Sequence, residues 1–283
     1  MRLAIISNTS AGNGVASSYL QKVFQACEAN GFTYEVFSNV LPEVHRLKEF
    51  NQLVIIGGDG TLHHVINAYK EALKDIPLSL LAAGTGNDFA RSVYLKQDFD
   101  FQLDRVLNGE LQPIDVGLCN EHWFLNGVGV GFDGAVVHKM LKDRWFSGHL
   151  SYYMAVLSLL FSYEETSLRI TIDQQTREEK ALMLTVGNGR FFGGGFLVTP
   201  QANLADGQLD ACTIGRIPKW QRAFHLPKIE KGLHLSLPFV RYEQAKEIRI
   251  ESTEPLHAHL DGEYHFGTDF RISLRPAYLQ FRI

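Results

Sequence analysis

Apolar and polar residues follow two different patterns along the 283-residue chain. In the first 112 residues, short apolar runs alternate with longer segments whose apolar residues recur at helical spacing. The apolar runs lie at 3–6, 32–37, 52–57 and 78–83, and the helical patterns cover 17–29 and 62–73. This alternation predicts a parallel sheet flanked by helices.

From residue 113 onward, the apolar runs follow one another with little more than turn residues between them. They cover 122–130, 167–173, 180–188, 208–215, 245–253, 257–261, 269–274 and 278–283, with one helical insert over about 132–165. Such a series predicts a mostly antiparallel sheet or sandwich. We therefore expect an α/β domain over 1–112 and a β-rich domain over 113–283. The final strand is expected either to stay in the second domain or to return to the first.

Composition narrows the class of protein. The formal net charge of −4 argues against non-specific nucleic-acid binding, which needs a basic face. Three scattered cysteines, without the spacing of a zinc site, favour a reducing cytoplasm over a disulfide framework. The longest mostly apolar stretch, 148–162, is shorter than the roughly 20 residues that span a bilayer. We expect a cytoplasmic protein that at most lies on a membrane surface.

A first candidate site follows the third run, where GGDGT at 57–61 leads into a helical pattern. Glycines between a strand and a helix expose backbone N–H groups, so this turn favours an anion such as phosphate. Asp59 would repel a bare phosphate, and we therefore expect Mg²⁺ between them. Thr61 is a candidate helix cap. The alternative is a tight turn with Asp59 as an exposed turn residue.

A second turn, GTGND at 84–88, follows the fourth run, with Asn87 or Asp88 as the expected helix N-cap. Because the carboxyl ends of parallel strands meet at one edge of a sheet, both turns should lie where ligands bind. The alternative is two unrelated helix caps.

Three further patterns have plainer interpretations. Residues 129–134 match GxGxxG, but no strand with an acid about 20 residues on follows them, so we expect close backbone approach instead of dinucleotide binding. His257 and His259 alternate on one strand face without a suitably spaced third ligand, which favours ordinary strand histidines over zinc. His63 and His64 are adjacent on a helix and should point to different faces.

The order of the motifs resembles that of the bacterial diacylglycerol-kinase-like lipid kinases. The motifs are GGDGT at 57–61, GTGNDFAR at 84–91, NGVGVGFDG at 126–134, GGG at 193–195 with ADGQLD at 205–210, and LDGE at 260–263. GGDGT alone is shared with NAD kinases and phosphofructokinases, whereas GTGNDFAR with a late DGE is more specific for lipid kinases. The resemblance covers nearly the whole chain. It implies a nucleotide-binding domain followed by a β-rich domain, with the active site between them.

The resemblance also implies roles for single residues. It assigns ATP contacts to Asn8, Ser38, Gly58, Asp59, Gly60, Thr61 and Thr85, and Gly57, Gly84, Asn87 and Asp88 complete the candidate nucleotide site. Ser38 matches by position only. Two departures from the family pattern are Thr9, which replaces a proline, and His63-His64, which replace Asn-Glu.

In the second domain, Glu263 matches the family's proposed general base, and Asp59 is the second candidate catalytic residue. Asp206 matches a structural Mg²⁺ site, with the backbone carbonyls of Asn203 and Gln208 as co-ligands. Without the resemblance, Asp-Gly in HAHLDGEYHF at 257–266 would be the tip of a plain hairpin.

The sequence therefore favours an ATP- and Mg²⁺-dependent kinase that phosphorylates a hydroxyl of a membrane lipid such as diacylglycerol. The alternatives are an NAD-kinase-like or other soluble-substrate kinase, and a non-catalytic nucleotide- or lipid-binding relative. Peripheral membrane association is expected, and a homodimer is compatible with the sequence. The segment 139–161, with Lys139, Lys142, Arg144, Trp145 and Phe146, is either an interfacial docking helix or a core-packed helix with a basic end.

Overall fold

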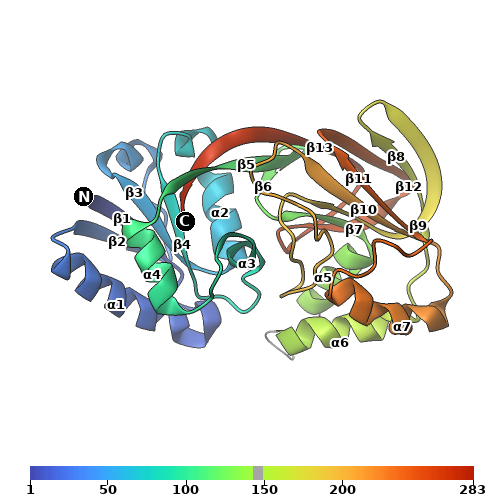
Figure 1. The fold of residues 1–283 in the computed structure, drawn as a ribbon, viewed down its shortest axis with the longest axis horizontal. Coiled ribbons are helices and arrows are strands. Elements are labelled where there is room, and N and C mark those ends of the chain that lie inside the picture. The colour runs from blue at the N-terminus through green and yellow to red at the C-terminus, as the bar shows by residue number, and fades with distance from the viewer. Residues whose placement is uncertain (143–148) are drawn as a thin grey trace. The chain divides into compact units, whose positions relative to one another are not determined.

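The computed structural model describes residues 1–142 and 149–283 (Figure 1). The chain forms two compact units. Unit 1 comprises Met1–Asp115 with Ala277–Ile283, and unit 2 comprises Val116–Pro276. The predicted fold class, an α/β part followed by a β-rich part, is confirmed by the elements of the two units.

Unit 1 contains a parallel sheet in the order β2-β1-β3-β4. Its strands are β1 (Arg2–Ser7), β2 (Thr33–Ser38), β3 (Gln52–Gly57) and β4 (Leu78–Ala82), and its α-helices are α1 (Val15–Ala29), α2 (Asp59–Tyr69), α3 (Asp88–Val93) and α4 (Phe99–Asn108). Short 3-10 helices cover Ala11–Gly14, Val44–Glu49 and Lys70–Leu73. The end of the last strand, β13 (Glu263–Arg282), returns to this sheet, where Phe281 pairs with Leu78 of β4.

The sheet of unit 1 is buried because helices cover it, as parallel sheets require. Every residue of β3 and β4 is buried, and apolar residues of α1 and α4 pack on the sheet. The one polar side chain within β3 is fully satisfied: Gln52 Nε2 donates to Ser79 Oγ at 2.8 Å, and its Oε1 accepts from Arg282 Nε at 3.1 Å. Because the four strands are parallel, their carboxyl ends lie at one edge of this well-packed sheet.

Unit 2 is built from antiparallel strands in the order β11-β10-β9-β7-β12-β13, with β8 beside β9 and β12. The strands are β5 (Leu111–Cys119), β6 (His122–Phe124), β7 (Gly127–Gly131), β8 (Thr166–Ile172), β9 (Gln175–Gly187), β10 (Leu209–Gly215), β11 (Val240–Ala245), β12 (Glu247–Leu260) and β13. Several predicted short strands are thus parts of two long ones, since β12 and β13 each join two predicted runs. Apolar side chains of these strands form one buried core.

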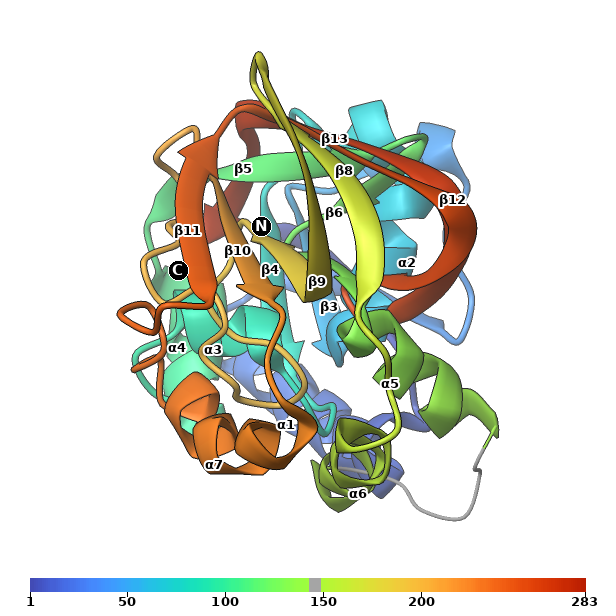
Figure 2. The ribbon, with the colours of Figure 1, turned by 90° about the vertical axis from the view of Figure 1, so that its right-hand side faces the viewer.

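Three helices form a layer against the other apolar surface of this sheet: α5 (Phe132–Lys142), α6 (His149–Leu160) and α7 (Lys219–Glu230). Figure 2 shows α6 and α7 together on one side of the strands of unit 2. The helical insert was predicted as one segment, but the described residues form two helices, and Arg144, Trp145 and Phe146 lie outside the described residues. Helix α7 was not predicted, because its sequence carries few core residues and contains Pro227.

Candidate functional site

The two glycine turns of unit 1 touch through their backbones. A Cβ on Gly84 would lie only 2.5 Å from the Cα of Gly58, and one on Gly58 would lie 2.9 Å from the Cα of Gly84. Real side chains do not tolerate such distances, so both positions need glycine. Without side chains there, backbone N–H groups at the ends of β3 and β4 can be approached closely, which is what an anion site requires.

Asp59 links the two turns. Its Oδ2 accepts a hydrogen bond from the backbone N–H of Asp88 at 3.0 Å, and its Oδ1 accepts from that of Phe89 at 3.1 Å. The carboxylate thereby satisfies the N-terminal N–H groups of α3, where the helix dipole favours negative charge. Asp59 is therefore more than an exposed turn residue, and the two turns are one connected structure instead of two unrelated caps.

The N-cap position predicted for Asn87 is confirmed, but neither Asn87 nor Thr61 makes the expected cap bond with its side chain. Asn87 stands at the N-cap position of α3 with a φ of 55°, but its side chain bonds to both backbone groups of Gly84, each at 2.9 Å, instead of capping the helix. Thr61 does not cap α2; its Oγ1 accepts from Asn8 Nδ2 at 3.3 Å. Asp59 caps α3 instead, because its carboxylate reaches the first N–H groups of that helix from the neighbouring turn.

The loop after β1 joins the same edge. Asn8 Oδ1 accepts from the N–H and the hydroxyl of Ser10, at 3.2 and 2.7 Å, while its Nδ2 reaches Thr61. Asn39, the residue directly after β2, contacts this loop, because its Nδ2 donates to the Oγ1 of Thr9 at 2.7 Å. Ser38 is exposed one residue earlier, and Thr85 is exposed in the second turn. Sequence reasoning missed Asn39, although an asparagine directly after a strand is a turn signal.

The two adjacent histidines of α2 face different ways, as predicted. His63 is buried, and Asn67 Nδ2 lies 3.2 Å from its Nε2, whereas His64 is exposed. The departure from the family pattern at these positions therefore places one imidazole in the packing of the helix and the other in solvent.

In unit 2, Asp261 and Gly262 form the tip of the hairpin between β12 and β13, with φ of 50° and 90°. Positive φ at both central residues fits the two-residue hairpin turn that Asp-Gly favours, so the predicted hairpin is confirmed. The Asp261 carboxylate accepts three backbone N–H groups, those of Leu125, Asn126 and Gly127, each at 2.9 Å. Glu263 follows as the first residue of β13 and is exposed.

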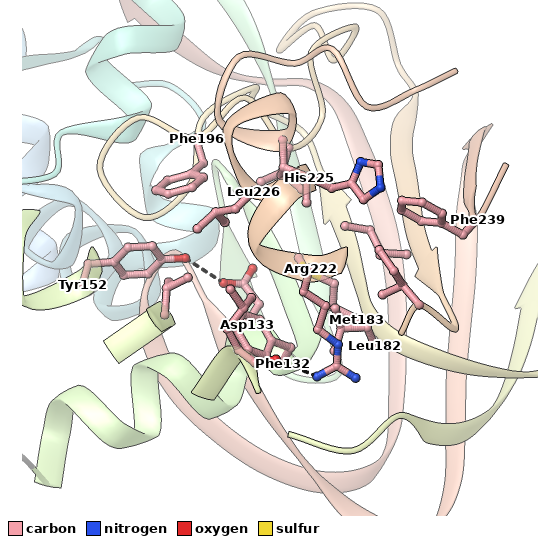
Figure 3. Close-up of a pocket in the computed structure, with 16 residues that line it drawn as sticks. Phe132, Asp133, Tyr152, Leu182, Met183, Phe196, Arg222, His225, Leu226 and Phe239 are labelled. Carbon is pink, nitrogen blue, oxygen red and sulfur yellow. Dashed lines mark hydrogen bonds between the residues drawn. The ribbon is translucent and has the colours of Figure 1, made fainter. Parts of the chain in front are cut away.

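A buried polar network lies behind this hairpin. His259 Nε2 lies 3.0 Å from Asp133 Oδ2, and the backbone N–H of Gly262 donates to His259 Nδ1 at 3.3 Å. Since Nδ1 accepts, Nε2 carries the proton and donates to Asp133. Tyr152 donates its hydroxyl to Asp133 Oδ1 at 3.1 Å (Figure 3). The network ties helices α5 and α6 to the turn that carries Glu263.

The network sets the charge of Asp133. Burial alone would raise the pKa of this carboxyl, but the electrostatic interaction and hydrogen bond with the His259 N–H, together with the Tyr152 hydroxyl, outweigh burial, so the pKa lies below its ordinary value. Asp133 is therefore an anion at neutral pH. Sequence reasoning placed it only within a glycine pattern, because its partner lies far away in the chain.

The glycines of that pattern serve close packing, as predicted. A Cβ on Gly129 would lie 2.4 Å from both Asp133 Oδ2 and His259 Nε2, and one on Gly134 would lie 2.3 Å from the backbone N of Ala258. His257 is likewise an ordinary strand histidine, with its Nδ1 2.7 Å from the Tyr264 hydroxyl. Within the described residues, no three His, Cys, Asp or Glu side chains are grouped to hold a metal.

The candidate metal residues of unit 2 lie in one turn. Asp206 is exposed, and its Oδ1 accepts the N–H of Gln208 at 3.0 Å; Asn203 Oδ1 accepts the N–H of Ala205 at 3.2 Å. The side chains of Asp206 and Asn203 thus fold back on the turn. The backbone carbonyls of Asn203 and Gln208 are the further oxygen donors expected there.

An apolar pocket lies between the sheet and the helix layer of unit 2 (Figure 3). Its cavity has a volume of about 50 Å³, and apolar side chains dominate its lining, among them Phe132, Tyr152, Leu182, Met183, Phe196 and Leu226. Asp133, Arg222 and His225 add polar groups to the lining. Arg222 pairs with Glu165 at 2.8 Å, and burial lowers the pKa of His225, so this imidazole is neutral at pH 7. The pocket is therefore a small cavity with a mainly apolar wall and a few polar groups at its margin.

No helix among the described residues has the length and apolar character needed to cross a membrane.

Comparison with known proteins agrees with both units. Residues 2–119 match the family model of the diacylglycerol kinase catalytic domain, and residues 126–282 match the YegS C-terminal NAD kinase beta sandwich-like domain. The diacylglycerol kinase of Mycobacterium tuberculosis (strain ATCC 25618 / H37Rv) is 32% identical over 242 residues, which cover 82% of this chain and 77% of the relative. The diacylglycerol kinase of Staphylococcus carnosus (strain TM300) is 27% identical over 271 residues, covering 93% and 89%.

The fold is also found among solved structures. A diacylglycerol kinase from Bacillus anthracis str. Sterne superposes with a TM-score of 0.74 at 22% sequence identity, covering 99% of this chain and 96% of that chain. The matched models together span nearly the whole sequence, in the order of the two units. The chain therefore belongs to the diacylglycerol kinase family, with its catalytic domain followed by the YegS-type C-terminal domain.

Proposed function

We propose that this protein is an ATP- and Mg²⁺-dependent lipid kinase that phosphorylates a hydroxyl of a membrane lipid such as diacylglycerol. The observation that carries this proposal is the pair of touching glycine turns held together by Asp59. Phosphoryl transfer depends mainly on positioning and charge neutralisation, and such turns present backbone N–H groups to phosphate.

The nucleotide site is assigned to the edge of the parallel sheet in unit 1. The hydrogen bonds of Asn8 and Asp59 connect the loop after β1, the turn 57–61 and the turn 84–88 there, and Asn87 closes the last of these turns on itself. Ser38 remains the weakest member, since Asn39 makes the contacts of β2 with this loop. We propose that ATP binds with its phosphates toward the glycine turns.

The donor atoms at this edge fit Mg²⁺. A carboxylate such as that of Asp59 offers about four lone-pair sites on its two oxygens, and hard cations prefer such oxygens. We propose that Asp59 holds Mg²⁺ beside the phosphates, where the ion would neutralise their charge. We likewise propose that the Asp206 carboxylate, with the carbonyls of Asn203 and Gln208, holds a structural Mg²⁺.

The acceptor is a lipid in this proposal because the curated relatives that share the family of this chain are diacylglycerol kinases. Glu263 is the proposed general base, which takes the proton of the lipid hydroxyl as that oxygen attacks the γ-phosphate. Its position after a turn fixed by three backbone hydrogen bonds to Asp261 supports this role, because a base must be held in place.

The proposal is tested by incubating the protein with labelled ATP, Mg²⁺ and a lipid extract, and identifying the product by mass spectrometry. Glu263→Gln should lower turnover about 100-fold or more while ATP binding is unchanged. Glu254→Gln, in an exposed position of β12, is the matched control and should retain activity. Full activity of Glu263→Gln would refute the base assignment. Formation of NADP from NAD, or ATP binding without any phosphorylated lipid, would favour one of the alternative functions.

A further inference from the structure

Helix α7 displays an aromatic and basic stripe to solvent. Trp220 is 73% exposed and Phe224, four residues later, is 70% exposed. Lys228 continues the same helical row, with its Nζ 5.6 Å from the centre of the Phe224 ring. Large aromatic side chains are seldom left in water, because removing their apolar surface from water is favourable. The exposed rings therefore make this stripe a candidate docking surface.

The stripe lies on a firmly anchored helix. On the opposite face of α7, Arg222 and Leu226 are buried. The Arg222 guanidinium pairs with Glu165 at 2.8 Å and donates to the carbonyls of Leu160 and Tyr163, at 2.9 and 2.7 Å. These bonds fix α7 to the end of α6. The exposure of Trp220 and Phe224 is thus a property of the packed fold.

Charge and neighbouring apolar residues favour a lipid surface as the partner. Lys231 follows α7, and Leu233, two residues further, is 63% exposed. Helix α6 exposes Met154 and Leu157 at a spacing that places them on one face, and Phe161 follows this helix. Aromatic anchors beside lysines match the boundary between acyl chains and anionic headgroups.

The same two helices line the apolar pocket with their other faces. Leu226 and Ile229 of α7, and Val156 and Leu160 of α6, contribute to its wall. One helix layer thus combines exposed apolar side chains on its outer face with a small apolar cavity beneath it.

We infer that the stripe of Trp220, Phe224 and Lys228, together with the exposed apolar side chains of α6, docks on an anionic lipid bilayer. This inference rests on the proposed lipid-kinase function and assigns the surface through which that function meets its substrate. The aromatic rings enter the headgroup region, and Lys228 and Lys231 contact lipid phosphates.

The test is sedimentation of the full chain with vesicles of equal parts phosphatidylcholine and phosphatidylglycerol, without ATP or diacylglycerol. The double variant Trp220→Ala/Phe224→Ala should bind at least about tenfold more weakly. Lys228→Glu/Lys231→Glu should weaken binding by about tenfold on these vesicles. Phe266→Ala and Lys180→Glu, at exposed positions of β13 and β9, are matched controls and should bind as the unaltered protein does.

Tryptophan fluorescence gives a second measurement. In a Trp145→Phe background, the emission of Trp220 should shift to shorter wavelength on vesicle binding, and Trp220→Phe should remove that shift, because the remaining Trp123 is buried. Circular dichroism melting should show that the variants remain folded. The inference is overturned if the aromatic double variant binds as tightly as the unaltered protein, if the controls lose as much binding, or if the unaltered protein does not bind.

These outcomes are separate from the test of the proposed function. A protein that phosphorylates detergent-dispersed diacylglycerol but does not bind vesicles would keep its kinase activity and lose the docking surface. A protein that binds vesicles through α7 but phosphorylates no lipid would keep the surface and lose the proposed function.

Discussion

Asp59 in unit 1 and Asp261 in unit 2 each precede a glycine in a short motif, but their carboxylates stabilise different structures. Both carboxylates accept backbone N–H groups. Asp59 accepts two at the start of a helix, where it joins two glycine turns, whereas Asp261 accepts three from one strand entry and fixes a hairpin. An acidic residue in a motif can thus hold the backbone of another segment in place.

The comparison extends to Asp133, the most deeply buried of these carboxylates, which pairs with His259 instead of backbone groups. Asp133→Ala should give the largest loss, about 3–4 kcal/mol in the free energy of unfolding, because the buried N–H of His259 and the Tyr152 hydroxyl both lose this acceptor. Urea unfolding measures this loss. Tyr152→Phe, which removes only one hydrogen bond to Asp133, should cost about 1 kcal/mol.

The loss should depend on pH with a defined sign. The pKa of Asp133 is lower in the folded protein than in the unfolded chain, so its contribution is complete above the unfolded value of about 4 and disappears as the pH falls through the folded value. The stability difference between Asp133→Ala and the unaltered protein should therefore be constant from pH 7 to about 5 and shrink below about 4. An unchanged difference in acid would contradict the assigned charge.

Asp261→Ala is expected to have the next largest effect, about 3 kcal/mol, because three N–H groups of the chain at 125–127 lose a charged acceptor. Asp173 provides the matched control: it also has a positive φ in a hairpin and accepts two N–H groups, but it is exposed. Asp173→Ala should cost less in the same urea titration. Equal losses would mean that Asp261 is only a surface turn residue.

Asp59→Asn should give the smallest loss of stability, about 1 kcal/mol, because the amide keeps one acceptor oxygen for α3. Its turnover should nevertheless fall about 100-fold, because the proposed Mg²⁺ ligand loses its charge. Asp98 caps α4 through a 2.9 Å bond to Phe101 in the same unit, so Asp98→Asn is the control for capping alone. Unchanged kinetics of Asp59→Asn across Mg²⁺ concentrations would refute the metal role.

The sequence patterns predicted the positions of helices and strands better than they predicted the contacts between them. The four strands of the parallel sheet lie within one or two residues of the predicted runs, since apolar periodicity is a local signal. Helix α7 escaped prediction because it buries little of its surface. The exposed Trp220 and Phe224 that make it a candidate docking element are the same residues that weakened its signal.

By itself, the sequence determined the order of an α/β part and a β-rich part, the two glycine turns, the Asp-Gly hairpin and the family to which these motifs point. These features are local, so neighbouring residues encode them. Only the tertiary structure decided that Asp59 caps a helix that begins 29 residues later, that Asp133 pairs with His259, and that α7 exposes its aromatic rings to solvent. Those outcomes depend on which distant groups meet when the chain packs, because a carboxylate is stabilised by whatever donors the fold brings to it.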